Sequence, residues 1–228
     1  AVLMGGQNAE RDISLKSGEG VLNALIQSGV DAHKVDVGHD IKDVLSQGHF
    51  DRAFIMLHGR GGEDGEIQSL LTELAIPFTG SDEQASALAM DKWRTKTRVS
   101  AQGILTPPAQ LIHSKKELLA LGAVDQYPLA IKPVHEGSSN GVSKVMRPSE
   151  LDKAYALALK YQDLVMAETW IEGDEYAVTI VGEQIFPCAK VSTPTRDFYD
   201  YQAKYYDHST LYECPSDLSS TEEAALQK

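Results

Sequence analysis

In the first third of the chain, short apolar runs alternate with segments whose apolar residues recur at the helical period. We expect strands at residues 1–4, 35–37 and 53–57, and helices at residues 14–27, 41–45 and 67–74. Strands joined by helical crossovers of this length form a mostly parallel sheet that is covered on both faces. The alternation therefore predicts a first α/β domain, which ends near Gly80-Ser81.

The pattern changes after a helical segment at residues 85–102, which we expect to break near Met90-Asp91. Strands are expected at residues 109–112, 129–133, 142–146 and 164–168, helices at 114–121 and 149–161, and a hairpin at 176–186 turned at Gly182-Glu183. Residues 193–219 are polar and aromatic without a clear period. Loops of this length are usually functional lids or mobile segments.

Charge excludes several classes of partner. The 228-residue chain has 33 Asp and Glu against 21 Lys and Arg, a formal charge of −12, and an acidic surface repels phosphate backbones. We therefore expect no nucleic acid partner. Because no apolar run approaches the roughly 18 residues of a membrane span and no leader peptide is visible, we expect no membrane partner either. Cys188 and Cys214 are too few for a disulfide framework, which favours a cytoplasmic protein.

Both ends of the chain suggest a fragment. It opens at Ala1 inside an apolar run without an initiator Met, and it closes where Ser220 and Glu223 match a Ser-x-x-Glu capping box. A helix of so few residues is marginal alone, so we expect that a substantial C-terminal segment is missing.

Two glycine-rich loops follow strands of the first predicted sheet, at the edge where open α/β sheets bind ligands. In the first loop, Gly5 and Gly6 permit close backbone approach and Glu10 offers a carboxylate to an amine. A plain strand–helix turn is the alternative. In the second loop, residues 58–65, His58 could donate to an anion or be a satisfied histidine at a strand end.

The most distinctive motif runs from Lys132 to Gly141, a loop of small residues between two predicted strands. Such a loop can present N–H and hydroxyl donors to phosphate oxygens, and the lysine adds a positive charge. It is not a Walker A loop, because no Gly-Lys-Ser/Thr sequence opens a helix here. We favour phosphate binding over a plain polar connection.

Two further segments are ambiguous when taken alone. Backbone groups after Glu168 could read an adenine edge, and a carboxylate could bind a ribose hydroxyl, but a packed edge strand is the alternative. Lys92 opens a helix and alone would be a surface lysine. Five aromatic residues between Phe198 and Tyr206 form either a disordered segment or a lid that excludes water from a substrate.

Together these loops resemble the D-alanine–D-alanine ligases of the ATP-grasp superfamily, in order and with similar spacing over nearly the whole chain. The most specific matching segments are Gly5-Gly6 with Ala9-Glu10-Arg11, residues 58–65, Met90-Asp91-Lys92, Lys132-Pro133 with residues 136–139, and residues 201–205.

The resemblance implies an α/β fold in which a Rossmann-like parallel-sheet domain precedes an ATP-grasp fold of two α+β lobes, the second truncated here. The implied domains are a substrate-binding domain at residues 1–82, a central lobe at 83–164, and the start of the C-terminal lobe at 165–228. A lid loop is expected at about residues 193–215.

The resemblance also implies a role for individual residues. ATP would be held by Lys92, Lys132, Glu168, Trp170, Ile171 and Glu175. Glu10 would bind the amino group of the first D-alanine and form a catalytic set with Ser138 and Tyr205 through hydrogen bonds. His58 and Lys204 would face the substrate or the transferred phosphate.

The implied activity is ATP-dependent ligation of two D-alanine molecules through an acyl phosphate, for peptidoglycan precursor synthesis. ATP and Mg²⁺ (or Mn²⁺) are the implied cofactors, and a homodimer is the implied assembly. A carboxylate becomes a good electrophile only when phosphorylated, so such a site must neutralise phosphate charge and exclude water. The metal ligands are expected beyond residue 228, so no residue here is assigned to metal and the fragment itself is not expected to ligate.

Two alternatives remain at this point. Another ATP-grasp carboxylate–amine ligase would share the nucleotide-holding lysines but not Glu10 or the Lys204-Tyr205 lid. A non-catalytic module with the same shape would bind ATP without D-alanine-dependent phosphate release.

Overall fold

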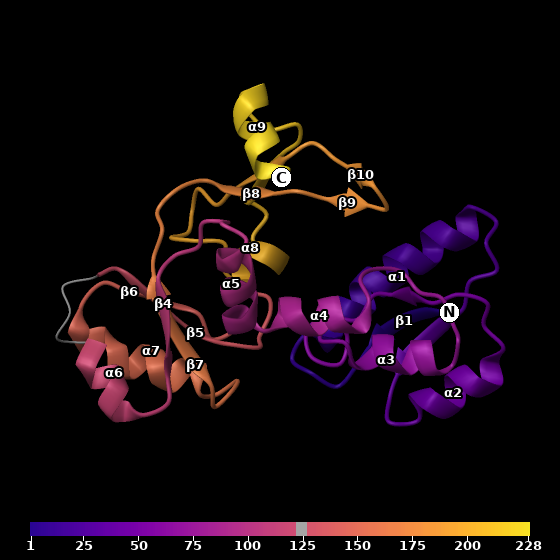
Figure 1. The fold of residues 1–228 in the computed structure, drawn as a ribbon. Coiled ribbons are helices and arrows are strands. Elements are labelled where there is room, and N and C mark those ends of the chain that lie inside the picture. Colours follow the sequence, from indigo (N-terminus) through magenta and orange to yellow (C-terminus); the bar gives the residue numbers. More distant parts are fainter. Residues whose placement is uncertain (122–126) are drawn as a thin grey trace.

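A computed structural model describes residues 1–121 and 127–228 (Figure 1). The N-terminal part is built on a parallel sheet of order β2-β1-β3, as the alternating pattern predicts. Its strands are β1 (Val2–Gly5), β2 (Lys34–Val37) and β3 (Phe54–Ile55), and its helices are α1 (Arg11–Gln27), α2 (Ile41–Gly48) and α3 (Glu66–Glu73).

Alternation along β1 supplies apolar side chains to both faces of this sheet. Val2 and Met4 pack with Leu22 of α1 on one face. Leu3, on the opposite face, packs with Leu45 of α2 and Leu71 of α3. Because neighbouring strand residues point to opposite sides, both faces are buried, which explains why the strand reads as a continuous apolar run.

Two helices connect this domain to the rest of the chain (Figure 1). α4 (Glu83–Met90) and α5 (Lys92–Ala101) are separated at Asp91, where the break was expected. Asp91 has an extended backbone, and its carboxylate accepts a hydrogen bond from the Arg94 N–H at 2.9 Å. A capped start of this kind fixes where α5 begins, and therefore where Lys92 lies.

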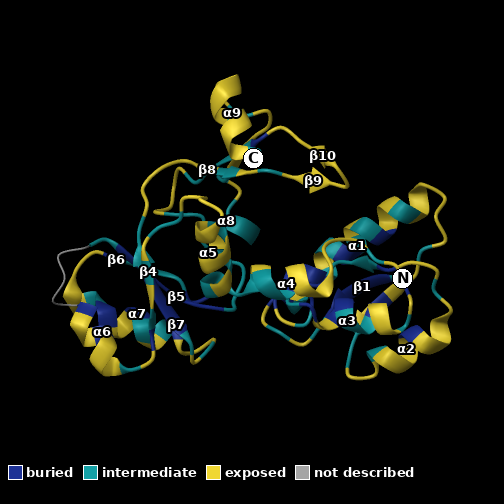
Figure 2. Cartoon of the chain, viewed as in Figure 1, coloured by how far each residue is buried: buried dark blue, intermediate teal, exposed yellow. Residues whose placement is uncertain are grey.

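The central part is a four-stranded antiparallel sheet of order β4-β7-β5-β6. Its elements are β4 (Ala109–Ile112), α6 (Lys115–Leu121), β5 (Leu129–Pro133), β6 (Ser143–Val145), a 3₁₀ turn (Pro148–Glu150), α7 (Leu151–Ala158) and β7 (Val165–Thr169). Leu118 of α6 and Ala158 of α7 are buried in one cluster with Ile131 of β5. Figure 2 shows this sheet, with β1, among the most buried parts of the chain.

The position of β7 bears on where the central lobe ends. β7 is hydrogen-bonded to β4 on one side and to β5 on the other, so it lies inside the central sheet. The sequence-based boundary at residues 164–165 precedes this strand. We therefore propose a boundary after Thr169.

The last part of the chain contains short elements that are mostly exposed, apart from β11 and α8, whose residues are mainly half-buried (Figure 2). They are β8 (Glu175–Ala177), β9 (Ile180–Val181), β10 (Gln184–Ile185), β11 (Ala189–Ser192), α8 (Tyr201–Tyr205), β12 (Leu211–Glu213) and α9 (Ser220–Leu226). β9 and β10 form the expected hairpin. β8 is not part of it, because it pairs with β11 in a separate sheet of order β12-β11-β8.

Three local predictions are wrong in detail. α1 begins at Arg11 rather than Ser14, and the helix expected at 149–161 is a 3₁₀ turn followed by α7. Residues 193–219 are not structureless, since α8 and β12 lie within them.

The terminal capping box also differs from its predicted position. It is formed by Ser219 and Glu222, one residue earlier than the predicted Ser220 and Glu223. Ser219 is the extended residue (φ −66°, ψ 154°), whereas Ser220 is already helical and cannot act as the N-cap.

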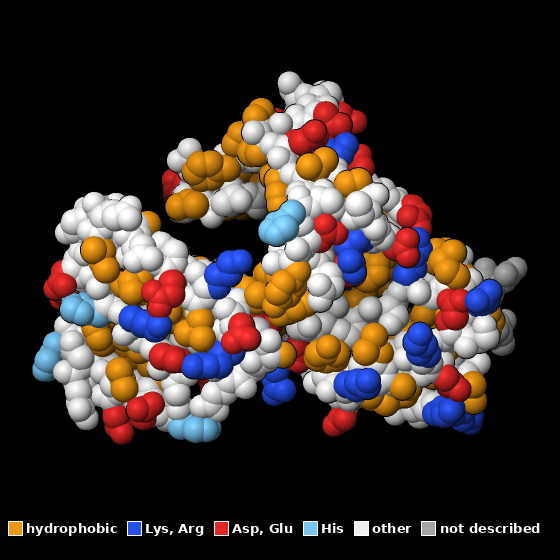
Figure 3. Space-filling model, turned by 180° about the vertical axis from the view of Figure 1, so that it is seen from behind, with side chains coloured by type: hydrophobic (Ala, Val, Ile, Leu, Met, Phe, Trp, Pro, Cys, Tyr) orange, Lys and Arg blue, Asp and Glu red, His pale blue; other side chains and the backbone are white. Residues whose placement is uncertain are grey.

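Two surface observations complete the fold. In the part of the chain that the structure describes, no helix has the length and apolarity to cross a membrane. On the face in Figure 3, acidic and basic side chains are interspersed over the surface. An anionic ligand would therefore be attracted by individual lysines that lie close together, and not by a broad basic surface.

The buried cluster of the central lobe makes a stability prediction. Leu118 is fully buried on α6, while its neighbour Leu119 is 60% exposed. We expect Leu118→Ala to lower the free energy of unfolding by about 2–5 kcal/mol, because it removes buried methyl groups and leaves a cavity. Leu119→Ala, the matched control, should change it by less than about 0.5 kcal/mol. Urea denaturation of both variants tests this, and equal effects would contradict the assigned orientation of α6.

Candidate active site

A buried carboxylate lies where three distant segments of the chain meet. Glu10, at the end of the loop after β1, is only 3% exposed. Its Oε1 accepts a hydrogen bond from the hydroxyl of Ser138, in the loop between β5 and β6. The Ser138 Oγ lies 2.6 Å from the hydroxyl oxygen of Tyr205 on α8. The three residues that the sequence analysis grouped together are therefore in contact.

The direction of these hydrogen bonds follows from the available protons. Ser138 has one hydroxyl proton and donates it to Glu10, so Tyr205 is the donor to Ser138. Burial raises the pKa of Tyr205. Tyr205 therefore keeps its proton at neutral pH. The chain of hydrogen bonds is directed from the tyrosine to the carboxylate.

The turn that carries Ser138 has unusual backbone geometry. Ser138 and Ser139 both have positive φ angles, 50° and 59°. Residues other than glycine rarely adopt this conformation, and two in succession are maintained only when the surroundings require them. Here the Ser139 hydroxyl also donates to the Tyr199 carbonyl at 2.9 Å. Both serine side chains thereby hold the segment around α8 against the loop.

The two glycine-rich loops of the N-terminal domain are joined by Asn8. Its side-chain amide donates to the carbonyl oxygens of His58 at 2.7 Å and of Arg60 at 2.6 Å. Gly59 is required at this junction, because a Cβ atom there would collide with the Glu10 carboxylate and its φ of 64° disfavours other residues. Both loops carry motifs that could be recognised in the sequence, but no role was predicted for Asn8, which lies within the first loop.

His58 is not a satisfied structural histidine. Its Nε2 is buried and has no hydrogen-bond partner among residues 1–121 and 127–228. A buried polar atom without a partner costs free energy, so it needs an explanation. A ligand bound beside the two glycine-rich loops would supply a partner. This observation favours the ligand-contacting alternative for His58.

Lys92 is held by the loop that contains Ser138. Its Nζ donates to the carbonyl oxygens of Val134, at 3.3 Å, and of Glu136. Burial, with a smaller contribution from the nearby Lys132, lowers the pKa of Lys92 from 10.5 to about 8. Lys92 is therefore a half-buried lysine whose ammonium group points toward the loop, and not the surface lysine that its sequence position alone indicates.

A second contact fixes the same loop to α5. A ring nitrogen of His135 lies 3.1 Å from the carboxylate of Asp91, and its backbone N–H donates to the Gln162 side chain at 2.9 Å. Asp91 therefore caps α5 and contacts the loop at once. The loop from Lys132 to Gly141 is held from both sides, which agrees with a binding role better than with a plain polar connection.

Lys132 forms an ion pair with Glu168, as neighbouring strands allow. β5 and β7 pair so that Ala130 is opposite Glu168, which leaves the two charged side chains close together. Lys96 of α5 contacts the other carboxylate oxygen of Glu168 at 2.8 Å. Burial would raise the pKa of Glu168, but hydrogen bonds from both lysines outweigh that effect and lower it.

The strand end after Glu168 leads into a cavity of about 430 Å³. Its lining includes Trp170, Ile171 and Glu175, together with Thr193 and Phe198 from the predicted lid segment. The rings of Trp170 and Phe198 meet edge to face, 5.3 Å between centroids. The structure therefore brings together, in one cavity, three residues assigned by resemblance to the nucleotide.

The aromatic segment is an ordered element. Asp200 caps α8 by accepting a hydrogen bond from the Ala203 N–H at 2.8 Å, and Ala203 is buried. Lys204 lies 5.1 Å from the centre of the Tyr199 ring. Burial lowers the pKa of Lys204, although nearby carboxylates, Glu175 first among them, partly oppose the shift. The segment therefore contains a short helix that packs against the loop carrying Ser138 and Ser139.

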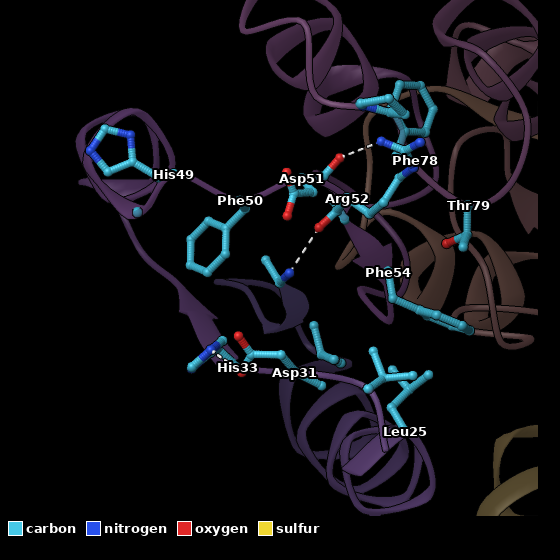
Figure 4. Close-up of a pocket in the computed structure, with 17 residues that line it drawn as sticks. Leu25, Asp31, His33, His49, Phe50, Asp51, Arg52, Phe54, Phe78 and Thr79 are labelled. Atoms are coloured by element: carbon cyan, nitrogen blue, oxygen red, sulfur yellow. Dashed lines mark hydrogen bonds and ion pairs between the residues drawn. The ribbon is translucent and has the colours of Figure 1, made fainter. Parts of the chain in front are cut away.

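Another cavity, of about 800 Å³, lies at the opposite, amino-terminal edge of the first sheet (Figure 4). Within its lining, Asp31 and His33 are 2.9 Å apart, and the amino group of Ala1 donates to the Arg52 carbonyl at 2.8 Å. Its lining shares no residue with the sites described above.

No cluster of three or more His, Cys, Asp or Glu side chains that could hold a metal ion occurs in the described ranges.

Comparison with known proteins identifies first the class and then the family. The chain superposes on the crystal structure of D-alanine–D-alanine ligase from Bacillus anthracis with a TM-score of 0.81 and 29% identity, covering 99% of this chain and 74% of that one. The crystal structure of the Bacillus anthracis enzyme complexed with ATP gives a TM-score of 0.80 at 25% identity, covering 99% and 73%. The fold is that of the ATP-grasp enzymes.

Sequence comparison then identifies the family. The model "D-ala D-ala ligase C-terminus" matches residues 101–228, and "D-ala D-ala ligase N-terminus" matches residues 39–81. The D-alanine–D-alanine ligase of Alkalilimnicola ehrlichii is 50% identical over all of this chain and 72% of that protein. That of Aromatoleum aromaticum is 48% identical over 73% of its length. The chain belongs to the D-alanine–D-alanine ligase family.

The contacts of Ser138 predict how the lid is held. We expect Ser138→Ala to remove the link between Glu10 and Tyr205 and to speed amide exchange across α8, because one of the two serine contacts to the lid is lost. Hydrogen-exchange mass spectrometry measures this, and peptides from α6 serve as the internal reference. Tyr212→Phe, which removes only the hydroxyl contact of Tyr212 to Tyr199, is the matched control. Unchanged exchange in Ser138→Ala would show that aromatic packing alone holds α8.

Proposed function

We propose that this chain binds ATP and D-alanine and carries the residues that join two D-alanine molecules into a dipeptide. The single observation that carries the proposal is the contact between Glu10, Ser138 and Tyr205, which links the N-terminal loop, the small-residue loop and the lid. The relatives named above are D-alanine–D-alanine ligases, and a protein of the same fold was crystallised with ATP.

Glu10 fits the ammonium group of an amino acid. A carboxylate that is 3% exposed is costly unless it is paired, and its one direct side-chain donor described here is the neutral hydroxyl of Ser138. An ammonium group would supply the opposite charge. His58, with its unpartnered Nε2 beside the same loops, would contact the remaining polar atoms of that substrate.

Lys92 and Lys132 fit the phosphates of ATP. Both lie at the small-residue loop, which can add N–H and hydroxyl donors. On a chain of charge −12, such placed cations must provide the attraction for a polyphosphate. The cavity lined by Trp170, Ile171 and Glu175 is next along the chain from Glu168 and would hold the base and ribose.

The lid would complete the chemistry. An acyl phosphate formed from D-alanine must be protected from water until the second amine attacks it. In the structure, α8 is held over Glu10 through Tyr205, and Lys204 is beside it, where its charge would face the transferred phosphate. When bound, Mg²⁺ would further neutralise phosphate charge.

We further propose a cytoplasmic homodimer without a nucleic acid partner, in the synthesis of peptidoglycan precursors. The acidic charge of −12 supports the absence of a polyanionic partner. Sedimentation of the full-length protein tests the dimer.

A phosphate-release assay tests the activity. The full-length protein should release phosphate from ATP in proportion to added D-alanine and form D-alanyl-D-alanine, while L-alanine should not substitute. Phosphate release that does not depend on D-alanine, or ATP binding without turnover, would favour one of the alternatives to a D-alanine ligase.

The lowered pKa of Lys92 predicts a proton uptake. At about pH 8, Lys92 is neutral in roughly half of the free protein molecules. A bound phosphate favours the charged form of Lys92 and so raises its pKa. ATP binding near pH 8 should therefore take up about half a proton, and the uptake should vanish well below this pH because the lysine is then already charged. Calorimetry in buffers of different ionisation enthalpy measures it.

Lys92→Arg is the matched control for this experiment, because arginine remains charged throughout the range. The variant should bind ATP without the uptake near pH 8. An uptake of the same size in Lys92→Arg would assign the proton to another group.

The Tyr205 hydroxyl predicts a preference for an amine nucleophile. Removing it in Tyr205→Phe deletes the donor to Ser138 and should cost about 1–3 kcal/mol in dipeptide formation while ATP binding is kept. An amine is increasingly protonated as the pH falls, whereas an alcohol is not. We therefore expect the variant to use D-lactate more, relative to D-alanine, at lower pH. Competition between the two between about pH 6 and 8 measures this, and an unchanged product ratio would reduce Tyr205 to a packing residue.

A further inference from the structure

Lys96 is a half-buried cation with no assigned role. It lies one helical turn after Lys92 on α5, so both lysines face the central sheet. Their partners differ, because Lys92 contacts backbone carbonyls of the small-residue loop whereas Lys96 contacts the carboxylate of Glu168 at 2.8 Å. The Lys96 side chain is 14% exposed and that of Glu168 is 12% exposed. An ion pair this buried is maintained by specific geometry.

Thr106 fixes the other side of this ammonium group. The Lys96 Nζ donates to the Thr106 Oγ1 at 2.6 Å, from the segment that follows α5. An ammonium group has three donors, and here two are used by Glu168 and Thr106. Lys96 is therefore directed at the carboxylate and not toward the small-residue loop.

Glu168 is shared between two lysines, one on each oxygen. Lys132 contacts Oε1 and Lys96 contacts Oε2. If Lys132 also contacts the phosphates of ATP, as proposed above, its charge is divided between the nucleotide and Glu168. The charge of Lys96 is not divided in this way, so Lys96 can hold Glu168 ionised and in place while a nucleotide is bound.

We propose that Lys96 is a positioning residue that selects the nucleotide base: it holds Glu168 as an ionised hydrogen-bond acceptor, which favours 6-amino over 6-oxo purine nucleotides. The inference rests on the proposed function for the placing of the base: the base would lie in the cavity lined by Trp170, two residues beyond Glu168 in the sequence, with its 6-position toward the Glu168 carboxylate. A carboxylate has about four lone-pair directions, so two lysine contacts leave room for an amino donor. A 6-oxo group presents an acceptor to the same carboxylate and is repelled.

The experiment compares ATP with inosine triphosphate in the full-length protein. We expect Lys96→Met to raise the KM for ATP, and the Kd for ATP in calorimetry, by about tenfold, because Glu168 loses a charge-assisted hydrogen bond. The KM for D-alanine should change little. The ratio of kcat/KM for ATP to that for inosine triphosphate should fall, because an unsupported Glu168 is more readily protonated and can then donate to a 6-oxo group.

Three further variants make the test specific. Lys96→Arg should restore most of the selectivity, since the charge is kept, and Thr106→Val should produce a smaller loss in the same direction. Lys115→Met is the matched control, because Lys115 pairs with Asp152 at 3.3 Å on the exposed surface of the central lobe. It should leave both nucleotide constants unchanged. If Lys96→Met does not fold, Thr106→Val and Lys96→Arg still test the proposal.

The outcomes separate this inference from the proposed function. An ATP-to-inosine triphosphate ratio that is unchanged in folded Lys96→Met, or a fall equally large in Lys115→Met, would overturn the role of Lys96. An absence of D-alanine-dependent phosphate release in the parent protein would instead overturn the proposed function. Binding of the two nucleotides by calorimetry would still test the inference in that case.

Discussion

A carboxylate buried between separate parts of a chain imposes a strict condition, because its charge must be compensated without water. Glu10 meets part of this condition through Ser138, whose hydroxyl donates to it and in turn accepts a hydrogen bond from Tyr205. A substrate ammonium group, as proposed above, would supply the opposite charge. The loop after β1, the loop between β5 and β6, and α8 are consequently held in one place. Three elements that are distant in the sequence depend on one another through this contact.

A second constraint is the distribution of positive charge. The chain is strongly acidic as a whole, yet Lys92, Lys96 and Lys132 are gathered around the central sheet. The three ammonium groups are stabilised in different ways. Lys92 donates to backbone carbonyls and has a lowered pKa, whereas Lys96 and Lys132 both pair with Glu168. Because these cations are partly buried, they are screened by salt less than surface charges would be.

Much of the N-terminal domain could be predicted from the sequence, because β1 and its neighbours are covered on both faces and their apolar runs are long enough to be recognised. The break between α4 and α5 was also predictable, since Asp91 is a capping residue. The pairing of β8 with β11 and the helix α8 were not predictable, because both elements are short and contacts with other parts of the chain decide their structure.

The site divides in the same way. Glu10, Ser138 and Tyr205 belong to recognisable motifs, and the structure places them in contact. Lys96 and Asn8 were missed because their importance lies in partners from other elements, Glu168 and the carbonyls of His58 and Arg60. Helical spacing from Lys92 was a signal that could have identified Lys96. No comparable signal in the sequence marks the contact of Asp91 with His135.

The two consecutive serines with positive φ illustrate a conflict between stability of the fold and function of the site. Glycine would relax the backbone at position 138 or 139, since it adopts such angles without strain. It would also remove the hydroxyl that reaches Glu10 or the Tyr199 carbonyl. A selection for thermal resistance alone could therefore accept glycine here, while a selection for the intact contact would keep serine. At this turn, the residue that would give the least backbone strain differs from the residue that makes the contacts of the site.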